Sequence, residues 1–176
     1  GTNIEIFTKQ LATADNPIYI TTDETKQEII DTMHTFQWDA SDIDFEDISQ
    51  KHLDYVREGE SKRISIYQQR SRNKIKELIK EGSQGVPSQH TGEEDYLAML
   101  SHHFRDNANR KIILNNLDFF LERYHLNDVV QTVKAGKINV SQQQGVLIII
   151  LTRGIHGTQL ERNIEALADC ILELDV

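Results

Sequence analysis

The stretch VLIIIL at residues 146–151 is the longest apolar run of the chain, and it is continuous rather than alternating. Two shorter runs have the same character, IYI at residues 18–20 and IIL at residues 112–114. Continuous apolar runs are typical of strands in a parallel sheet whose two faces are both covered. These runs predict the core strands of an α/β fold, and ILEL at residues 171–174 predicts a fourth strand.

Segments with helical periodicity lie between these runs. Two apolar stripes carry the pattern, Ile29, Ile30 and Met33 in the first and Leu97, Leu100 and Phe104 in the second. Helices that alternate with strands predict βαβ units and a mainly parallel sheet. Residues 82–88 (GSQGVPS) and 106–109 (DNAN) predict a loop and a turn, and Gly145 predicts the end of a helix.

Composition favours a folded, globular protein, because 38% of the 176 residues are hydrophobic and 27% are charged. The net charge of −9 argues against non-specific binding to nucleic acid, which needs a basic surface. No apolar run approaches the ~20 residues that span a bilayer. The single cysteine, Cys170, excludes a disulfide framework and a cysteine zinc site, and its apolar neighbours predict a small core residue. We therefore expect a cytoplasmic protein without membrane contact.

Residues 61–80 are unusually basic for so acidic a chain. The basic residues are Lys62, Arg63, Arg70, Arg72, Lys74, Lys76 and Lys80, and apolar residues are interspersed at Ile64, Tyr67, Ile75, Leu78 and Ile79. The favoured interpretation is an amphipathic helix with a solvated face. The alternative is a docking surface for an acidic partner or nucleic acid.

Four segments resemble the KaiC-like branch of the RecA-type ATPases. Residues 17–25 (PIYITTDET), a helix and then residues 36–39 (FQWD) are similar to the strand, acidic pair and aromatic-Gly-Trp-Asp stretch of that family, with Gln37 where glycine is usual. Residues 110–116 (RKIILNN) resemble its Walker B strand, and residues 146–152 resemble the next core strand. Residues 164–171 resemble the stretch before a late strand. The matches occur in the family's order and cover most of the chain, and residues 61–103 cannot be placed.

The resemblance implies a RecA-like three-layer αβα domain over residues 1–176, with a helical insertion and loop at residues 61–92. It also implies that the chain lacks the strand that precedes the phosphate loop. In the family a lysine of that loop neutralises the phosphates, a Ser/Thr hydroxyl and a Walker B aspartate hold Mg²⁺, and an acidic residue orients water. By position, Gly1 and Thr2 begin the loop, Ile4 replaces the lysine, and Glu5 replaces the hydroxyl.

The replacements indicate lost catalysis. An apolar Ile4 cannot neutralise phosphate, Glu5 would repel it, and Asn115 at the Walker B position binds Mg²⁺ more weakly than a carboxylate would. The acidic pair Asp23 and Glu24 remains as the catalytic candidates. The candidates for nucleotide contact are Gly1, Thr2, Asn115, Thr152 and Arg153. A competing interpretation makes residues 3–7 an edge strand, which leaves no phosphate loop.

Several of these residues also have a structural interpretation. Asp23 and Glu24 precede a helix and could cap it, and residues 152–157 (TRGIHG) could form a flexible loop instead of an anion contact. None of the seven histidines forms an i, i+4 pair, and adjacent His102 and His103 face different sides of a helix, so no metal site is expected. Trp38 predicts a packing anchor, and Asp39 with Ser41 predicts a cap or turn.

The leading hypothesis is a pseudo-ATPase that works through assembly or regulation, with a homo-oligomer or protein partner, no cofactor and no nucleic acid. One alternative is an ATP- and Mg-binding nucleotide switch that uses backbone N–H groups, Arg153 and the Asp23/Glu24 pair. The other alternative is a docking module built on the basic helix at residues 61–80.

Overall fold

A computed structural model describes residues 3–13, 16–77 and 95–173. The chain divides into two units. Unit 1 consists of Gly1–Ser49 and Asp95–Val176, and unit 2 of Gln50–Glu94. Unit 2 begins before the insertion expected at residues 61–92, and the loop predicted at residues 82–88 lies outside the described residues.

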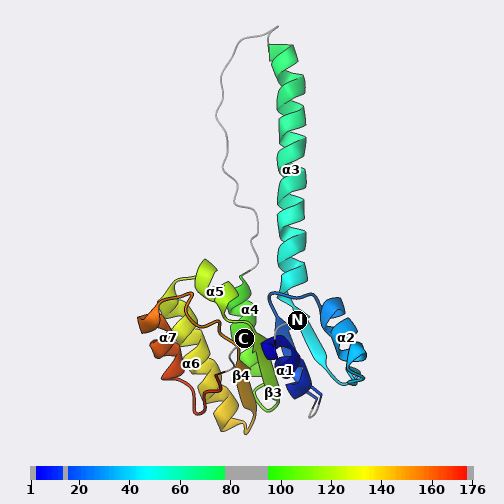
Figure 1. Cartoon of the computed structure of the whole chain (residues 1–176). Coiled ribbons are helices and arrows are strands. Elements are labelled where there is room, and N and C mark those ends of the chain that lie inside the picture. The colour runs from blue at the N-terminus through cyan, green and yellow to red at the C-terminus, as the bar shows by residue number, and fades with distance from the viewer. Residues whose placement is uncertain (1–2, 14–15, 78–94, 174–176) are drawn as a thin grey trace. The chain divides into compact units, whose positions relative to one another are not determined.

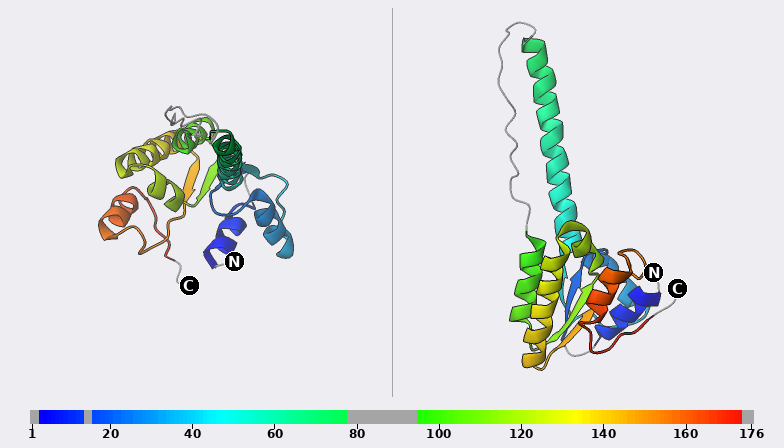
Figure 2. Two further views of the ribbon diagram at one scale, coloured as in Figure 1. Left: turned by 90° about the horizontal axis from the view of Figure 1, so that it is seen from above. Right: turned by 90° about the vertical axis from the view of Figure 1, so that its left-hand side faces the viewer.

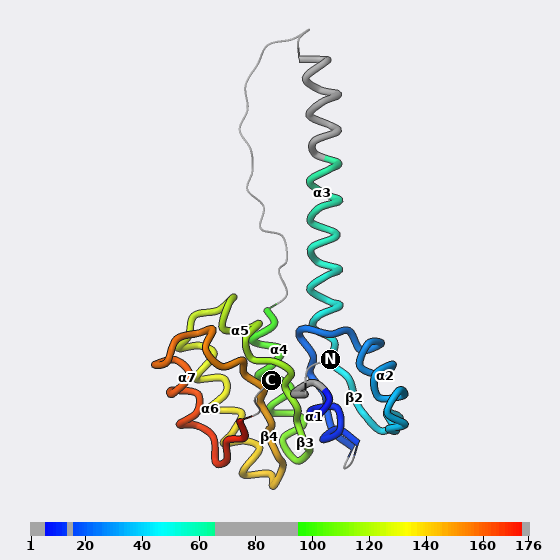
Figure 3. Tube along the Cα trace, viewed as in Figure 1, coloured from blue at the N-terminus to red at the C-terminus, as the bar shows by residue number. Residues whose placement is uncertain are grey.

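Unit 1 is built on a four-stranded sheet, which is parallel throughout (Figure 1). The strands are β1 (Ile18–Thr21), β2 (Asp44–Asp47), β3 (Lys111–Asn115) and β4 (Val146–Ile149), in the order β2-β1-β3-β4. In the register of the two central strands, Ile20 lies opposite Leu114 and Thr21 opposite Asn115. The trace in Figure 3 shows these strands side by side although a long stretch of chain separates them. The predicted α/β class and parallel sheet are confirmed.

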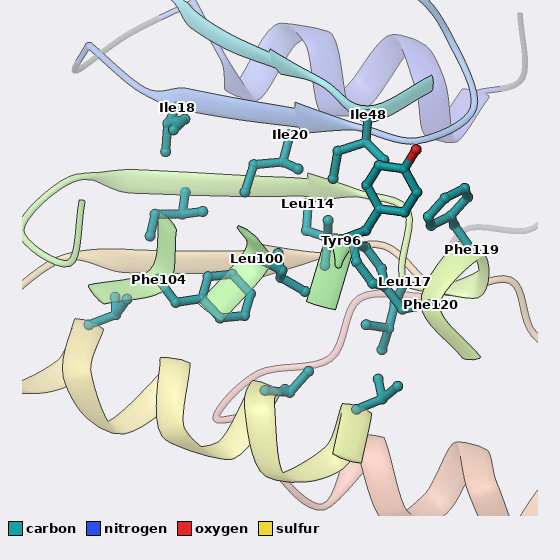
Figure 4. Packing of buried hydrophobic residues seen from close by; sticks show 14 of the residues in the cluster. Ile18, Ile20, Ile48, Tyr96, Leu100, Phe104, Leu114, Leu117, Phe119 and Phe120 are labelled. Atoms are coloured by element: carbon teal, nitrogen blue, oxygen red, sulfur yellow. The ribbon is translucent and has the colours of Figure 1, made fainter. Parts of the chain in front are cut away.

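Helices cover both faces of this sheet, as the two views of Figure 2 show. The described helices of unit 1 are α1 (Asn3–Leu11), α2 (Lys26–Thr35), α4 (Tyr96–Asp106), α5 (Asp118–Arg123), α6 (Leu126–Gln142) and α7 (Thr158–Glu165). Alternate residues of a strand point to opposite faces of the sheet, so the same strands contribute side chains to two hydrophobic cores. One core joins Ile20 and Leu114 to α4–α7 (Figure 4), and the other joins Tyr19 and Ile113 to α1 and α2.

The predicted helical stripes lie in these cores. Ile29 and Met33 of α2 and Leu100 and Phe104 of α4 are fully buried or nearly so. Gly136 of α6 faces the Phe104 ring so closely that a Cβ would lie 2.8 Å from the ring Cγ. A glycine is therefore required where α6 packs on α4.

The aromatic stretch after α2 forms the predicted turn. Trp38 packs against the second core, and the Ser41 N–H donates to Asp39 Oδ1 at 2.9 Å. Gln37 has φ of 58°, in the left-handed region that favours glycine. A residue with a Cβ therefore adopts a conformation that glycine would adopt at lower cost.

Two predicted strands do not form, one strand was missed, and one glycine has another role than predicted. Residues 171–173 are not a strand, and β2, with the sequence DFED, was missed because it lacks an apolar run. Residues 3–7 form part of helix α1, so the edge-strand interpretation fails. Helix α6 ends near the predicted place, but Gln144 takes the positive φ of 60°. Gly145 is needed for close approach instead, because a Cβ there would clash with the carbonyl oxygens of residues 108 and 110.

Unit 2 contains helix α3 (Ile48–Glu77), whose first two residues belong to unit 1. The helix begins thirteen residues before the predicted basic segment and includes it as far as Glu77. Among residues 50–65, where the side chains are described, none is buried. Of the helices in the described part of the chain, none has the length and apolar character needed to cross a membrane.

Candidate functional site at the carboxyl edge of the sheet

Parallel strands end at a common edge, and in open α/β sheets this carboxyl edge is where ligands bind. The segments that follow β1, β3 and β4 meet there in unit 1. Two hydrogen bonds join the first two segments, from Thr22 N–H to Asn115 O and from Asn116 N–H to Thr22 Oγ1, each 2.8 Å long. Thr22 is buried, and the peptide bond between Asn115 and Asn116 is cis. The two hydrogen bonds join the ends of β1 and β3 at this edge.

Asp23 projects from this edge. Its Oδ2 accepts from Asn116 Nδ2 at 2.6 Å, and its Oδ1 lies 3.2 Å from the Thr22 hydroxyl. Partial burial raises the pKa of the Asp23 carboxyl, the Thr22 hydroxyl opposes this, and the nearby carboxylates of Asp118, Glu122 and Glu24 add to the rise. The site is therefore acidic and disfavours further negative charge.

Glu24 is held by a buried cation. Lys9 Nζ of α1 lies 2.7 Å from Glu24 Oε1, and the exposed fractions of the two side chains are 1% and 21%. Neither Asp23 nor Glu24 caps α2, so the capping interpretation is wrong. Thr25 is the N-cap and forms a capping box with Glu28. The acidic pair is thus used in side-chain contacts at the edge of the sheet.

A second carboxylate, Asp118, anchors the loop after β4. His156 Nε2 lies 2.7 Å from Asp118 Oδ1, and both side chains are close to nine-tenths buried. The Thr152 N–H donates to Asp118 Oδ2 at 3.2 Å, and the Gly154 N–H donates to Glu161 Oε1 at 2.7 Å. Two backbone N–H groups that could hold an anion therefore already bind protein carboxylates.

The remaining candidates are separated. Arg153 is exposed, and its Nη1 contacts Glu173 Oε2 at 2.6 Å instead of reaching Asp23. Asn115 is buried, and its Nδ2 has no hydrogen-bond partner among the described residues. Gly1 and Thr2 lie outside the described residues.

Four contributors were missed in the sequence: Lys9, Asn116, Asp118 and His156. Asn116 and Asp118 directly follow β3, and His156 lies in the loop after β4, so their position at the carboxyl edge could have identified them. Lys9 lies fifteen residues before Glu24 in a helix, and no pattern in the sequence links the two.

Other polar candidates have local partners. His102 Nε2 contacts Asp106 at 3.0 Å and His103 Nε2 contacts Glu46 at 3.1 Å, which confirms that the adjacent histidines face different sides. Within the described ranges, no three His, Cys, Asp or Glu side chains are grouped to hold a metal ion. Cys170 is exposed, so its prediction as a core residue is wrong, because the strand expected around it does not form.

No protein-family model matches the chain, and comparison with curated proteins and with solved structures finds no similar protein. The assignment of unit 1 to the α/β class rests on its own sheet and on the helices that cover it.

Proposed function

We propose that the chain is a catalytically degenerate RecA-like domain of the KaiC-like kind, a pseudo-ATPase that acts through assembly or regulation. The observation that carries the proposal is the state of the positive charges around the carboxyl edge. Lys9 is bound by Glu24 and Arg153 contacts Glu173, and the His156 ring is already held by Asp118. A polyphosphate would have to break the buried pair of Lys9 with Glu24 before that lysine could neutralise it.

Two further features support the proposal. In the loop after β4, the N–H groups of Thr152 and Gly154 donate to protein carboxylates. An anionic ligand would have to compete with these carboxylates for the same donors. Burial, and after it the surrounding carboxylates, already raise the pKa of Asp23, so a phosphate at this edge would meet like charge. The sequence adds Ile4 and Glu5 at the positions of the family's lysine and hydroxyl.

The test is a thermal melt of the whole chain with and without millimolar MgATP, together with an assay for released phosphate. We expect no shift in Tm and no hydrolysis. A ligand at a hundredfold excess over its Kd would stabilise the folded state by about 2.7 kcal/mol. For a chain of this size that is a rise of about 5–11 °C, which would refute the proposal.

A matched pair of variants sharpens the test. Ile4→Lys with Glu5→Ser restores the family's charge and hydroxyl, and Ile6→Lys with Phe7→Ser adds the same groups two residues further along α1. If a phosphate pocket persists and only its chemistry was lost, the first variant gains a MgATP shift and the second does not. If neither gains a shift, the loss includes the pocket itself.

One observation favours a nucleotide switch as the second candidate. The Nδ2 donor of Asn115 is buried without a partner in the described part of the chain, and a buried donor left unsatisfied costs free energy. A ligand oxygen would satisfy it. A MgATP shift in the unmodified chain, lost in Asn115→Leu but retained in Thr152→Val, would establish this candidate.

A further inference from the structure

Helix α3 carries an apolar stripe that the chemistry of unit 1 does not explain. The stripe consists of Leu53, Val56, Ile64, Tyr67 and Ile75, at successive spacings of three, eight, three and eight residues. Its period is eleven residues, which corresponds to about 3.67 residues per turn and keeps the positions on one face of a continuous helix. Figure 1 shows α3 as one uninterrupted helix.

The described part of this stripe is exposed. The exposed fractions are 39% for Leu53, 40% for Val56 and 58% for Ile64. Most helical stability in proteins comes from packing of an apolar face, and a helix without such packing is marginal in water. A face with a regular apolar repeat from Leu53 to Ile75 therefore calls for a second helix.

The stripe is symmetric about its own middle. Reversal of the helix about the bond between Ser65 and Ile66 exchanges Ile64 with Tyr67 and Val56 with Ile75. Two copies of α3 that run in opposite directions can therefore pair apolar position with apolar position along about 30 Å, the length of twenty helical residues. A two-fold interface of this kind requires such self-complementarity.

The charges favour the same orientation. Residues 61–76 contain six of the nineteen Lys and Arg residues of the chain and none of its 28 Asp and Glu residues. Residues 48–60 of α3 carry Asp54, Glu58 and Glu60 together with Lys51 and Arg57, all exposed, so this part of the helix is close to neutral. Their pairs within the helix, Asp54 with Arg57 and Glu58 with Lys62, are long and solvated and contribute little. An antiparallel partner brings Glu60 level with its Arg70 and Arg72, whereas a parallel partner places the two basic halves together.

We propose that α3 pairs with α3 of a second copy of this chain as an antiparallel two-helix coiled coil. The inference gives the assembly part of the proposed function a defined surface and rests on that function only for its role. It does not depend on whether unit 1 binds nucleotide. Arg70 and Arg72 then lie level with Glu58 and Glu60 of the partner copy.

The first experiment measures the mass of the full chain by sedimentation at concentrations of about 1–200 μM. We expect a dimer, and we expect Ile64→Asp with Tyr67→Asp to raise its dissociation constant at least about 100-fold, because charge enters the paired face. The matched control is Gln69→Asp, which puts the same side chain on the opposite face of α3 and should leave the dimer intact. Trp38 fluorescence, which reports on unit 1, should melt alike in all three proteins.

The second experiment tests orientation through conservative changes. In a Cys170→Ser background, chains with Val56→Cys are mixed with chains carrying Ile75→Cys and oxidised. Antiparallel pairing predicts a cross-link between the two kinds of chain, and a cross-link between identical chains would show a parallel pair. A monomer at every concentration, or a monomer that binds a single-stranded RNA oligonucleotide, would overturn the proposal. A MgATP shift in the melt would instead refute the pseudo-ATPase proposal and leave the dimer untouched.

Discussion

The buried ion pair between Lys9 and Glu24 gives the sharpest test of the candidate site. The Lys9 side chain is 1% exposed, and the second carboxylate oxygen of Glu24 is buried without a hydrogen-bond partner among the described residues. Lys9→Met removes the charge and keeps much of the chain length. It leaves Glu24 as a largely buried carboxylate without its cation.

The expected cost of Lys9→Met is about 3–5 kcal/mol, the usual range when one partner of a buried pair is removed. Since Glu24 keeps some contact with solvent, the lower end of that range is expected. In a chain of this length, 3 kcal/mol lowers Tm by about 6–12 °C. The double variant Lys9→Met/Glu24→Gln removes both charges and should recover to within about 1 kcal/mol of the original protein.

The assay is urea unfolding followed by the fluorescence of Trp38, the only tryptophan of the chain. Lys134→Met on exposed helix surface is the matched control and should change stability by less than about 0.5 kcal/mol. The reasoning fails if Lys9→Met is as mild as this control, or if the double variant is less stable than Lys9→Met alone.

Three other predictions concern packing, backbone and pH. Gly136→Ala should lose about 1–2 kcal/mol in urea unfolding, because crowding against Phe104 outweighs the better helix propensity of alanine; a gain would contradict the packing described for α4 and α6. Gln37→Gly should raise the free energy of unfolding by about 0.5–1 kcal/mol, because glycine adopts the φ of 58° found at this position without steric strain. A lower Tm would contradict this. Asp23→Asn should raise Tm at about pH 7, and the gain should fade as the pH falls towards about 4. The folded-state pKa of Asp23 is raised, so its ionised form opposes folding and its protonated form does not; a gain that grows in acid would show the opposite sign.

The sequence predicted three of the four strands and missed β2. The central strands β1 and β3 are buried under helices on both faces, and β4, at one edge of the sheet, packs against the same two cores, so all three have continuous apolar runs. β2 lies at the edge of the sheet with only Phe45 as an apolar residue, so its pairing with β1 comes from the tertiary structure. The apolar residues at 171–173 pointed to a strand that does not form there.

The candidate site was predicted in part for a similar reason. Asp23 follows a strand, and the general rule for parallel sheets placed it at the carboxyl edge. Its partner Asn116 and the pair of Asp118 with His156 come from two other segments, so their contacts depend on strand order and register. The contact from Lys9 to Glu24 depends on how α1 packs, which leaves no trace in the spacing of residues.

The pairing of β1 with β3 also has a kinetic consequence. Neighbouring residues at these strand ends, such as Thr22 and Asn116, are 94 positions apart, so the centre of the sheet forms only after a long loop closes. Pairings of this kind slow folding, because the entropy of closure is lost before the contacts form. About half of that loop is unit 2. The entropic cost of closing a loop grows only with the logarithm of its length, so the inserted half adds about 0.6 kcal/mol. A long helix can therefore be inserted at this point of the chain with little effect on the stability of the sheet.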